Sequence, residues 1–482
     1  MRAFEWVILL AAITLALWTM AGPPSTVWQS VLSASIPIGA ISLHSVLEGL
    51  RWQMIPLYAA LLGAAILTAL ASFGGLGSMG AVPRFAAPIT IFGLALAGAS
   101  LSIIFPVFAA PPVGGRYAVG TTHLDVTHVA SRADGQSLTR RIAVEIWYPA
   151  SPQADDSGTQ YGFRGSGFRL SHLPLVSTRA VKDAPFVAGP SPYPLLLYVP
   201  SWSGQRFENS FLLSSLASQG YVVAAIDYPD GEILRPEVSE AQPPDLAAPM
   251  EFSSEEAYRN TLARAELRVR SQAKDAIFVL DRLQALARDK GAAVFSGRLA
   301  PNAVGMIGFS FGGAVAYQAA WLDHRIAAVL NMDGWMFGDA ARSGFATPRF
   351  FMSDDTPLPS PRDLESSDPT TRSMADLNLR DDRICRMQLA KYGGYRMVIA
   401  GTRHVNFSDR PLYSAIPRLV GGGPIKPRRA ASIIDAFAVA FFDKYLKGTP
   451  SPLLDEDQSD FPEAKLESWS GSNRAALVGT AR

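Results

Sequence analysis

The chain has 482 residues and a formal net charge of +1, so its charge gives no reason to expect a nucleic acid or another strongly charged partner. Its single cysteine, Cys385, excludes internal disulfide bonds, and its six histidines form no closely spaced pair of the kind that binds a metal. We therefore expect neither a metal nor a cofactor. The length predicts two or three domains. Mean hydropathy is positive, and the apolar residues are concentrated at the N-terminus.

Residues 1–110 form this apolar region. The charged residues that precede Arg116 are Arg2, Glu5, Glu48, Arg51 and Arg84. The apolar stretches are residues 6–20, 27–47, 54–71 and 85–109. Each approaches or exceeds the length needed to cross about 30 Å of hydrocarbon. Serines, a proline and a histidine dilute the second stretch, so we predict a bundle of three or four transmembrane helices.

Residues 111–450 begin with a segment rich in proline and glycine and then alternate between strand-like and helix-like runs. The predicted strands are residues 141–148, 193–199, 221–226, 304–308, 326–332, 348–352 and 395–400. The predicted helices are residues 207–219, 255–289, 314–320 and 430–445. This alternation predicts a doubly wound, mostly parallel α/β sheet. Residues 451–482 are polar, and we expect them to form a tail on the surface.

The hexapeptide Gly308-Phe309-Ser310-Phe311-Gly312-Gly313 lies between a predicted strand and a predicted helix. Gly-x-Ser-x-Gly in this position is typical of a nucleophile elbow, a sharp turn that holds the serine Oγ clear of the sheet. The N-terminus of the following helix favours negative charge beside the serine. Ser310 is therefore the candidate nucleophile, and we predict an α/β-hydrolase fold.

In this fold the acid and the histidine follow the nucleophile, each in a loop beyond the carboxyl end of a strand. His404 follows the last predicted parallel strand at that end, whereas His324 precedes a strand and lies at the opposite end. We predict His404 as the base. The spacing leaves the acid open, because Asp333 directly follows one strand and Asp354 and Asp355 follow the next.

Two backbone N–H groups are expected to bind the oxyanion of the reaction. One belongs to Phe311, the residue after the nucleophile, and the other comes from the loop that follows the strand 193–199. That loop is Pro200-Ser-Trp-Ser-Gly204, in which Trp202 is the candidate donor. The alternative role for Trp202 is to line the acyl pocket with its indole ring.

These stretches resemble the platelet-activating-factor acetylhydrolase family, in its plasma, lipoprotein-associated type and its bacterial relatives. Gly308–Gly313 is similar to the family's Gly-His-Ser-Phe-Gly-Gly, and Met332-Asp-Gly-Trp-Met-Phe337 resembles its Asp-x-Trp-Met-Phe segment, which carries the triad acid. Gly401-Thr-Arg-His-Val-Asn-Phe407 resembles the segment with the catalytic histidine, and Leu216–Ile226 resembles the strand after the oxyanion loop. The resemblance implies Asp333 as the acid.

The chain departs from the family at two places in the pocket wall. Phe309 stands where the family usually has histidine, and Pro200-Ser201 stands where it usually has a His-Gly pair. Neither change removes a triad group, but both bear on which substrate is preferred.

The resemblance implies a membrane-anchored serine esterase that removes short or oxidised sn-2 acyl groups from phospholipids without a cofactor or metal. One alternative is a general carboxylesterase or polyester-type hydrolase with the same triad, and another is an inactive, membrane-tethered binding protein. Relatives with similar N-terminal helices imply an integral protein of the bacterial inner membrane with an extracytoplasmic catalytic domain. The few arginines near the predicted spans slightly favour the opposite orientation if there are four spans.

Overall fold

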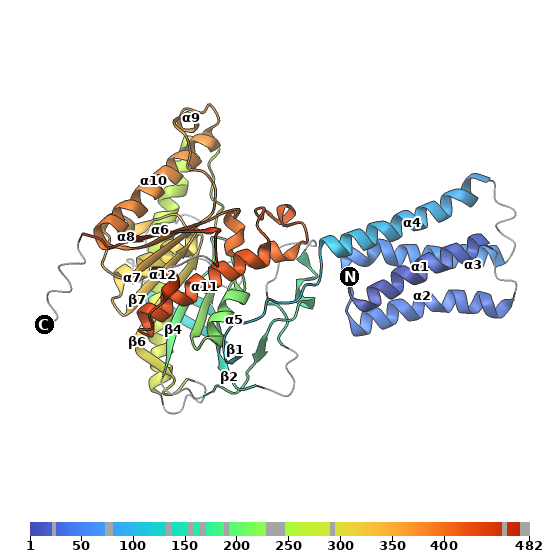
Figure 1. Ribbon diagram of the computed structural model, residues 1–482, viewed down its shortest axis with the longest axis horizontal. Helices are drawn as coiled ribbons and strands as arrows, with labels where there is room; N and C mark the ends of the chain where they lie inside the picture. Colours follow the sequence, from blue (N-terminus) through green and yellow to red (C-terminus); the bar gives the residue numbers. More distant parts are fainter. Residues whose placement is uncertain are drawn as a thin grey trace. The chain divides into compact units, whose positions relative to one another are not determined.

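The computed structural model divides the chain into two compact units (Figure 1). The residues that it describes are 1–21, 26–72, 81–131, 137–152, 158–162, 170–187, 192–227, 246–289, 295–455 and 460–472. The helical unit comprises Met1–Ala109, Gln160–Ser177 and Leu412–Val420. The sheet unit comprises Ala110–Thr159, Thr178–Pro411 and Gly421–Arg482. Two short segments of the later sequence therefore belong with the N-terminal helices, which the sequence did not predict.

The helical unit is built on four helices. Their bounds are α1 (Ala3–Ala21), α2 (Val27–Leu47), α3 (Ile55–Ser72) and α4 (Ala81–Ile104), with a 3₁₀ turn, η1, at Trp52–Met54. Within the described residues, Trp52–Ala71 and Ala86–Ile104 are long and apolar enough to cross a membrane. Ala3–Trp18 and Ser35–Leu47 are shorter apolar stretches. Two of the three or four predicted spans thus meet this criterion of length and composition.

Segments 160–177 and 412–420 are joined to the end of α4 within the helical unit. Ser414 Oγ and the Ala415 N–H both donate to the carbonyl of Ile104, each over 2.9 Å. The hydroxyls of Tyr161 and Tyr413 are 2.8 Å apart, which links the two segments to each other. The segments also contain the 3₁₀ turns η3 (Leu173–Leu175) and η7 (Pro417–Val420).

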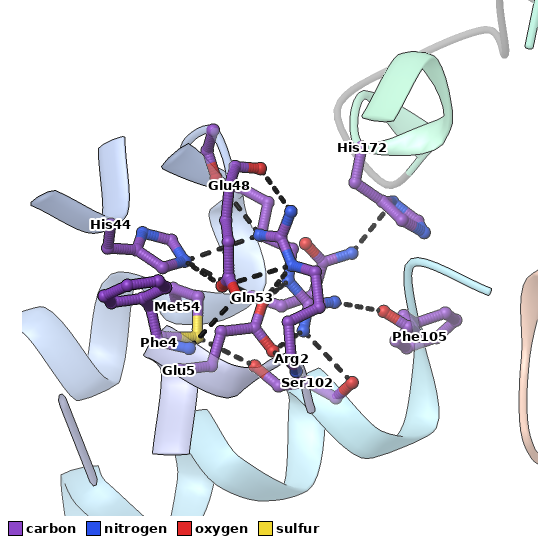
Figure 2. A network of polar contacts seen from close by, with 12 residues as sticks. Arg2, Phe4, Glu5, His44, Glu48, Gln53, Met54, Ser102, Phe105 and His172 are labelled. Atoms are coloured by element: carbon purple, nitrogen blue, oxygen red, sulfur yellow. Dashed lines mark hydrogen bonds and ion pairs between the residues drawn. The ribbon is translucent and has the colours of Figure 1, made fainter. Parts of the chain in front are cut away.

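A network of charged and polar side chains lies at one end of the helical unit (Figure 2). Arg51 holds the buried carboxylate of Glu5 through two hydrogen bonds of 2.7 Å, and it also donates to the carbonyl of Phe105 over 2.6 Å. Arg2 also binds this carboxylate, with Nε 2.9 Å from Oε1. The network therefore ties together the starts of α1 and η1 and the end of α4.

The sheet unit contains a ten-stranded sheet in the order β10-β9-β8-β7-β6-β4-β5-β2-β1-β3. The strands from β5 to β9 in this order pair in parallel, as predicted, while β2 pairs antiparallel with β5, β1 with β2, and β10 with β9. The central strands are β4 (Tyr193–Val199), β5 (Val222–Asp227), β6 (Leu299–Phe309), β7 (Ile326–Met332), β8 (Arg349–Ser353) and β9 (Gly394–Ile399). The outer strands are β1 (Ala118–Ser131), β2 (Ser137–Ala150), β3 (Ala180–Lys182) and β10 (Ala464–Trp469).

Helices cover both faces of this sheet, which is why the central strands are apolar throughout. Side chains of β6 reach the core on both faces of the sheet. Val304 and Met306 belong to one core cluster, and Ile307 and Phe309 belong to the other. The first cluster includes residues of α6 (Glu255–Arg288), α7 (Phe311–Leu322), α8 (Gly338–Ser343) and α10 (Pro369–Tyr392). The second includes residues of α5 (Ser210–Ser218), α11 (Pro427–Leu446) and α12 (Pro452–Asp455).

Part of the segment that we expected to be a surface tail is a component of the sheet. Residues 464–469 form β10, which pairs antiparallel with β9, and Leu454 of α12 is buried in the core. The polar alternation of Ala-Lys-Leu-Glu-Ser-Trp fits an edge strand with one solvated face. Residues 456–459 and 473–482 of the predicted tail lie outside the described residues.

Candidate active site

Ser310 occupies a sharp turn between β6 and α7. Its φ of 55° lies in the left-handed region that non-glycine residues seldom adopt, so the surrounding structure must hold it there. The Ser310 N–H donates to the carbonyl of Met332 over 2.8 Å. A Cβ at Gly308 would lie 1.9 Å from the carbonyl oxygen of Gly312, so only glycine fits at this position. The geometry is that of the predicted nucleophile elbow.

Asp333 and His404 converge on Ser310 from two other strands. Asp333 directly follows β7, and His404 begins the 3₁₀ turn η5 (His404–Phe407) after β9. The Oδ2 of Asp333 is 2.6 Å from Nδ1 of His404, and Nε2 of His404 is 3.0 Å from Oγ of Ser310. The structure thus brings together the three residues that the sequence predicted as a triad.

The other candidates for acid and base lie in different positions. Asp354 donates its backbone N–H to Oδ1 of Asp333 over 2.9 Å, and Asp355 accepts the N–H of Gly401 over 2.8 Å. Both carboxylates therefore lie near the site, but Asp333 is the one that contacts the imidazole. His324 is exposed just before β7, at the opposite end of that strand from Asp333.

The charges around His404 favour its protonated form. Although 48% of the His404 side chain is exposed, desolvation of the remainder acts to lower its pKa. The hydrogen bond to Asp333 and the charges of Asp333, Asp354 and Glu208 outweigh desolvation, so the pKa of His404 lies above its ordinary value. Burial, reinforced by the neighbouring Asp333 carboxylate, raises the pKa of Asp354.

Phe309 packs directly against the imidazole. The two rings are stacked, with centroids 5.0 Å apart and planes inclined by 30°. Phe309 is only 2% exposed and belongs to the core cluster beneath α11. The residue that departs from the family pattern therefore forms an apolar support for one face of His404.

Arg268 fixes the loop that carries Trp202. Its guanidinium lies 4.0 Å from the centre of the Trp202 ring and donates to the Trp202 carbonyl. The indole ring meets Phe311 edge-on, with centroids 4.6 Å apart. Among the hydrogen bonds of the described residues, the backbone N–H groups of Trp202 and Phe311 have no protein acceptor, so both are available to a ligand.

Helix α10 holds the loop that begins at Asp333. Asp381 accepts the N–H of Met336 over 2.6 Å, and Arg380 donates to the Met336 carbonyl over 2.9 Å. Asn378 accepts the indole N–H of Trp335 over 2.8 Å. Burial raises the pKa of Asp381 to about 7, despite the hydrogen bond from Met336. No local signal in the sequence indicated these supporting residues.

One group of described side chains has the geometry of a cation site, and it lies in the helical unit. Ligand atoms of Glu5, His44 and Glu48 are all within 4.8 Å of one another. Arg51 and Arg2 already bind the Glu5 carboxylate, and Nε of Arg2 is 3.6 Å from Glu48. These two guanidinium groups supply the positive charge that a metal ion would bring, so the cluster is best described as a network of ion pairs.

Comparisons with known proteins place the chain in a family. A protein described as "Probable 1-alkyl-2-acetylglycerophosphocholine esterase" from Arthroderma benhamiae is 25% identical over 288 residues, which are 56% of this chain and 65% of the fungal protein. The platelet-activating factor acetylhydrolase of Cavia porcellus is 23% identical over 362 residues, covering 70% of this chain and 78% of that protein.

A solved structure supports the fold independently. The ferulic acid esterase of Streptomyces cinnamoneus superposes with a TM-score of 0.54 over 75% of this chain and 99% of the esterase, at 24% identity. This likeness agrees with the mixed sheet and flanking helices of an α/β-hydrolase. The model of the family described as "Platelet-activating factor acetylhydrolase, isoform II" matches residues 104–450. The chain therefore belongs to this family.

Proposed function

We propose that this protein is a membrane-anchored serine esterase in which Ser310, His404 and Asp333 form the catalytic triad. The observation that carries the proposal is the continuous hydrogen-bonded series from Asp333 through His404 to the Ser310 hydroxyl, at 2.6 and 3.0 Å. Membership of a family of acetylhydrolases supports an ester as the substrate.

In this mechanism Ser310 attacks the ester carbonyl while Nε2 of His404 takes its proton. Asp333 keeps the proton of His404 on Nδ1, which leaves the lone pair of Nε2 facing the serine, and it stabilises the imidazolium that forms. His404 then protonates the leaving alcohol, and water hydrolyses the acyl-enzyme by the reverse sequence of proton transfers. None of these steps requires a metal or cofactor.

The backbone N–H groups of Phe311 and Trp202 would bind the oxyanion that develops during the attack. Phe311 begins α7, so its N–H lies at the positive end of the helix dipole. The carbonyl and ring of Trp202 are both held by Arg268, which limits the movement of its peptide. Fixed donors of this kind stabilise the transition state without having to reorganise.

The proposed substrates are phospholipids with a short or oxidised sn-2 acyl group. The names of the fungal and guinea-pig relatives both refer to acetylated glycerophospholipids. The helical unit is consistent with attachment to a bilayer, because large apolar side chains lie on its surface and such patches mark membrane contacts. Examples that are each at least 61% exposed are Trp28, Ile38, Ile66, Ile89 and Leu96.

We further propose that the helices cross the bacterial inner membrane and that the sheet unit is extracytoplasmic. Protease treatment of intact cells tests this placement. Fragments of the sheet unit released from outside would support it, and full protection until the membrane is opened would contradict it.

Labelling with a fluorophosphonate probe tests the nucleophile in the full-length protein. The probe should modify Ser310 and should not label Ser310→Ala. Absence of labelling in a folded wild-type protein would contradict the triad and would favour an inactive binding protein. Labelling that persists in Ser310→Ala would assign the nucleophile to another residue.

A general carboxylesterase is the second candidate, favoured by the aromatic contact between Trp202 and Phe311 next to the nucleophile. The ratio of kcat/KM for an sn-2-acetyl phospholipid to that for a simple aryl acetate separates the two. A ratio above one supports the phospholipid, and a ratio far below one supports the general esterase.

A further inference from the structure

Glu208 lies beneath the oxyanion loop, and neither the family pattern quoted above nor the triad gives it a role. Its two carboxylate oxygens bind one residue: Oε2 accepts the backbone N–H of Ser201 over 2.9 Å, and Oε1 accepts the Ser201 hydroxyl over 2.9 Å. The contact is close enough that a Cβ at Gly204 would lie 2.1 Å from Oε2. Glycine at position 204 therefore leaves the space that the carboxylate occupies.

This contact occupies one of the N–H groups of the oxyanion loop. The Ser201 N–H is taken by Glu208, whereas the Trp202 N–H has no acceptor among the described residues. The peptide between Ser201 and Trp202 carries the latter N–H, and it is held on one side by Glu208 and on the other by Arg268 at the Trp202 carbonyl. An anion and a cation thus fix the two ends of this short segment.

The same residue joins the oxyanion loop to the histidine loop. The carbonyl of Glu208 accepts the N–H of Asp409 over 3.0 Å, and the amide of the adjacent Asn209 donates to the carbonyl of Phe407 over 2.7 Å. The Glu208 carboxylate is also close enough to interact with His404 electrostatically. The other carboxylates that act on His404 are Asp333 and Asp354. Burial raises the pKa of Glu208, while its hydrogen bonds from Ser201 and the charges of His404 and Arg410 oppose this rise.

We propose that Glu208 is a positioning residue of this active site: it fixes Ser201 so that the Trp202 N–H is presented to the oxyanion, and its carbonyl helps to tie this loop to the one that carries His404. The inference rests on the proposed triad and extends it. Because Ser201 stands where the family usually has glycine, its hydroxyl supplies a contact that the usual residue lacks. Glu208 acts through Ser201 and His404 and does not itself touch the substrate.

Glu208→Gln in the full-length protein tests the proposal with a soluble aryl acetate. Loss of a single oxyanion donor costs about 100- to 1,000-fold in kcat, so a misplaced donor should lower kcat by about 10- to 100-fold while KM changes little. Removing the negative charge should also lower the pKa of His404, which moves the acid limb of the kcat/KM profile to lower pH. Glu208→Asp, which keeps the charge, should leave that limb near its wild-type position.

Two further variants keep the experiment decisive. Asp435→Asn is the matched control, since Asp435 is also a partly buried carboxyl that accepts a serine hydroxyl, that of Ser215, over 2.9 Å. This variant should leave kcat and the pH profile unchanged. Ser201→Ala removes only the hydroxyl contact and should lower kcat by a smaller factor in the same direction.

A folded Glu208→Gln protein with the wild-type kcat and pH profile would overturn the inference. If Glu208→Gln does not fold, a Ser201→Ala protein with the wild-type kcat would overturn it. Neither result would bear on the triad, whose own test is the Ser310→Ala variant. Activity that survives in Ser310→Ala would contradict the proposed function.

Discussion

Replacing Asp333 with asparagine should reverse the proton arrangement of His404. The backbone N–H of Asp354 donates to Oδ1 of Asp333 over 2.9 Å, so an asparagine would keep its carbonyl oxygen there. Its amide nitrogen would then occupy the place of Oδ2, which is 2.6 Å from Nδ1 of His404. A donor at this place requires Nδ1 to be the acceptor, so the proton moves to Nε2. The imidazole can then no longer accept the proton of Ser310.

The size of the effect follows from this change of tautomer. In the serine protease that serves as the reference for this substitution, the corresponding change lowers kcat about 10,000-fold, equivalent to about 5 kcal/mol of transition-state stabilisation. We expect a loss of similar size for Asp333→Asn, measured as kcat for an aryl acetate. The protein should remain folded, since asparagine retains the hydrogen bond from Asp354.

Asp354→Asn and Asp355→Asn are the matched controls, because both carboxylates lie near the site without contacting the imidazole. Asp354→Asn retains the backbone N–H that binds Asp333, so kcat should stay within about tenfold of the wild-type value, far from the loss expected for a change of tautomer. If Asp333→Asn retained wild-type activity while one of the other two variants lost it, the assignment of the acid would be wrong.

Phe309→Leu removes the ring stacked on His404. Since an aromatic pair contributes about 0.5–1.5 kcal/mol, kcat should fall about 2- to 10-fold with KM unchanged. An unaltered kcat would show that the stacked ring does not support the base. Folding raises the pKa of Asp381 to about 7 from an ordinary value of about 4. The neutral form of Asp381 therefore favours the folded state. This stabilisation is complete below about pH 4 and is lost as the pH rises to about 7. The Tm of the wild type should therefore fall relative to that of Asp381→Asn between about pH 4 and 7. Parallel Tm curves would contradict the burial of a neutral carboxyl. Glu5→Gln leaves the buried Arg51 without its charged partner and replaces one of the two oxygens that it binds with an amide donor. This change should cost about 3–5 kcal/mol and lower the Tm of the full-length protein in nanodiscs. Adding Arg51→Gln should recover part of this loss, and a Glu5→Gln protein as stable as the wild type would contradict the role given to the ion-pair network.

Ser310 and His404 could be predicted because each has a local signal. The glycines around Ser310 reflect the close approach of Gly308 to the carbonyl of Gly312, and His404 follows a strand by a short loop. The acid could not be chosen from spacing, because Asp333 and Asp354 follow neighbouring parallel strands, β7 and β8, and reach the same edge of the sheet. The family resemblance favours Asp333, and Asp333 is the residue that contacts the imidazole.

The supporting residues have no comparable signal. Arg268 reaches the Trp202 carbonyl across 66 positions, and Asp381 reaches the Met336 N–H across 45. Arg268 lies on the predicted helix 255–289, which is α6, and reads there as an ordinary charged position. Helix α10, which carries Asp381, is not among the predicted helices. Their roles depend on how these helices pack, which periodicity alone does not specify.

The strands that can be predicted from the sequence are those in which most side chains are buried. The central strands are buried on both faces and read as continuous apolar runs, so they were identified. The outer strands β1, β3 and β10 were missed because their exposed faces carry polar residues, and β10 was assigned to a tail. The inclusion of residues 160–177 and 412–420 in the helical unit depends on tertiary contacts with α4 and had no sequence signal.

Hydrolysis of an sn-2-acetyl phospholipid by the full-length protein in bilayer nanodiscs, compared between the wild type and Ser310→Ala, tests the central claim most directly. We predict that the wild type releases acetate and that this activity is at least about 1,000-fold lower in Ser310→Ala, as expected when the nucleophile of a triad is removed. Equal rates for the two proteins would contradict it.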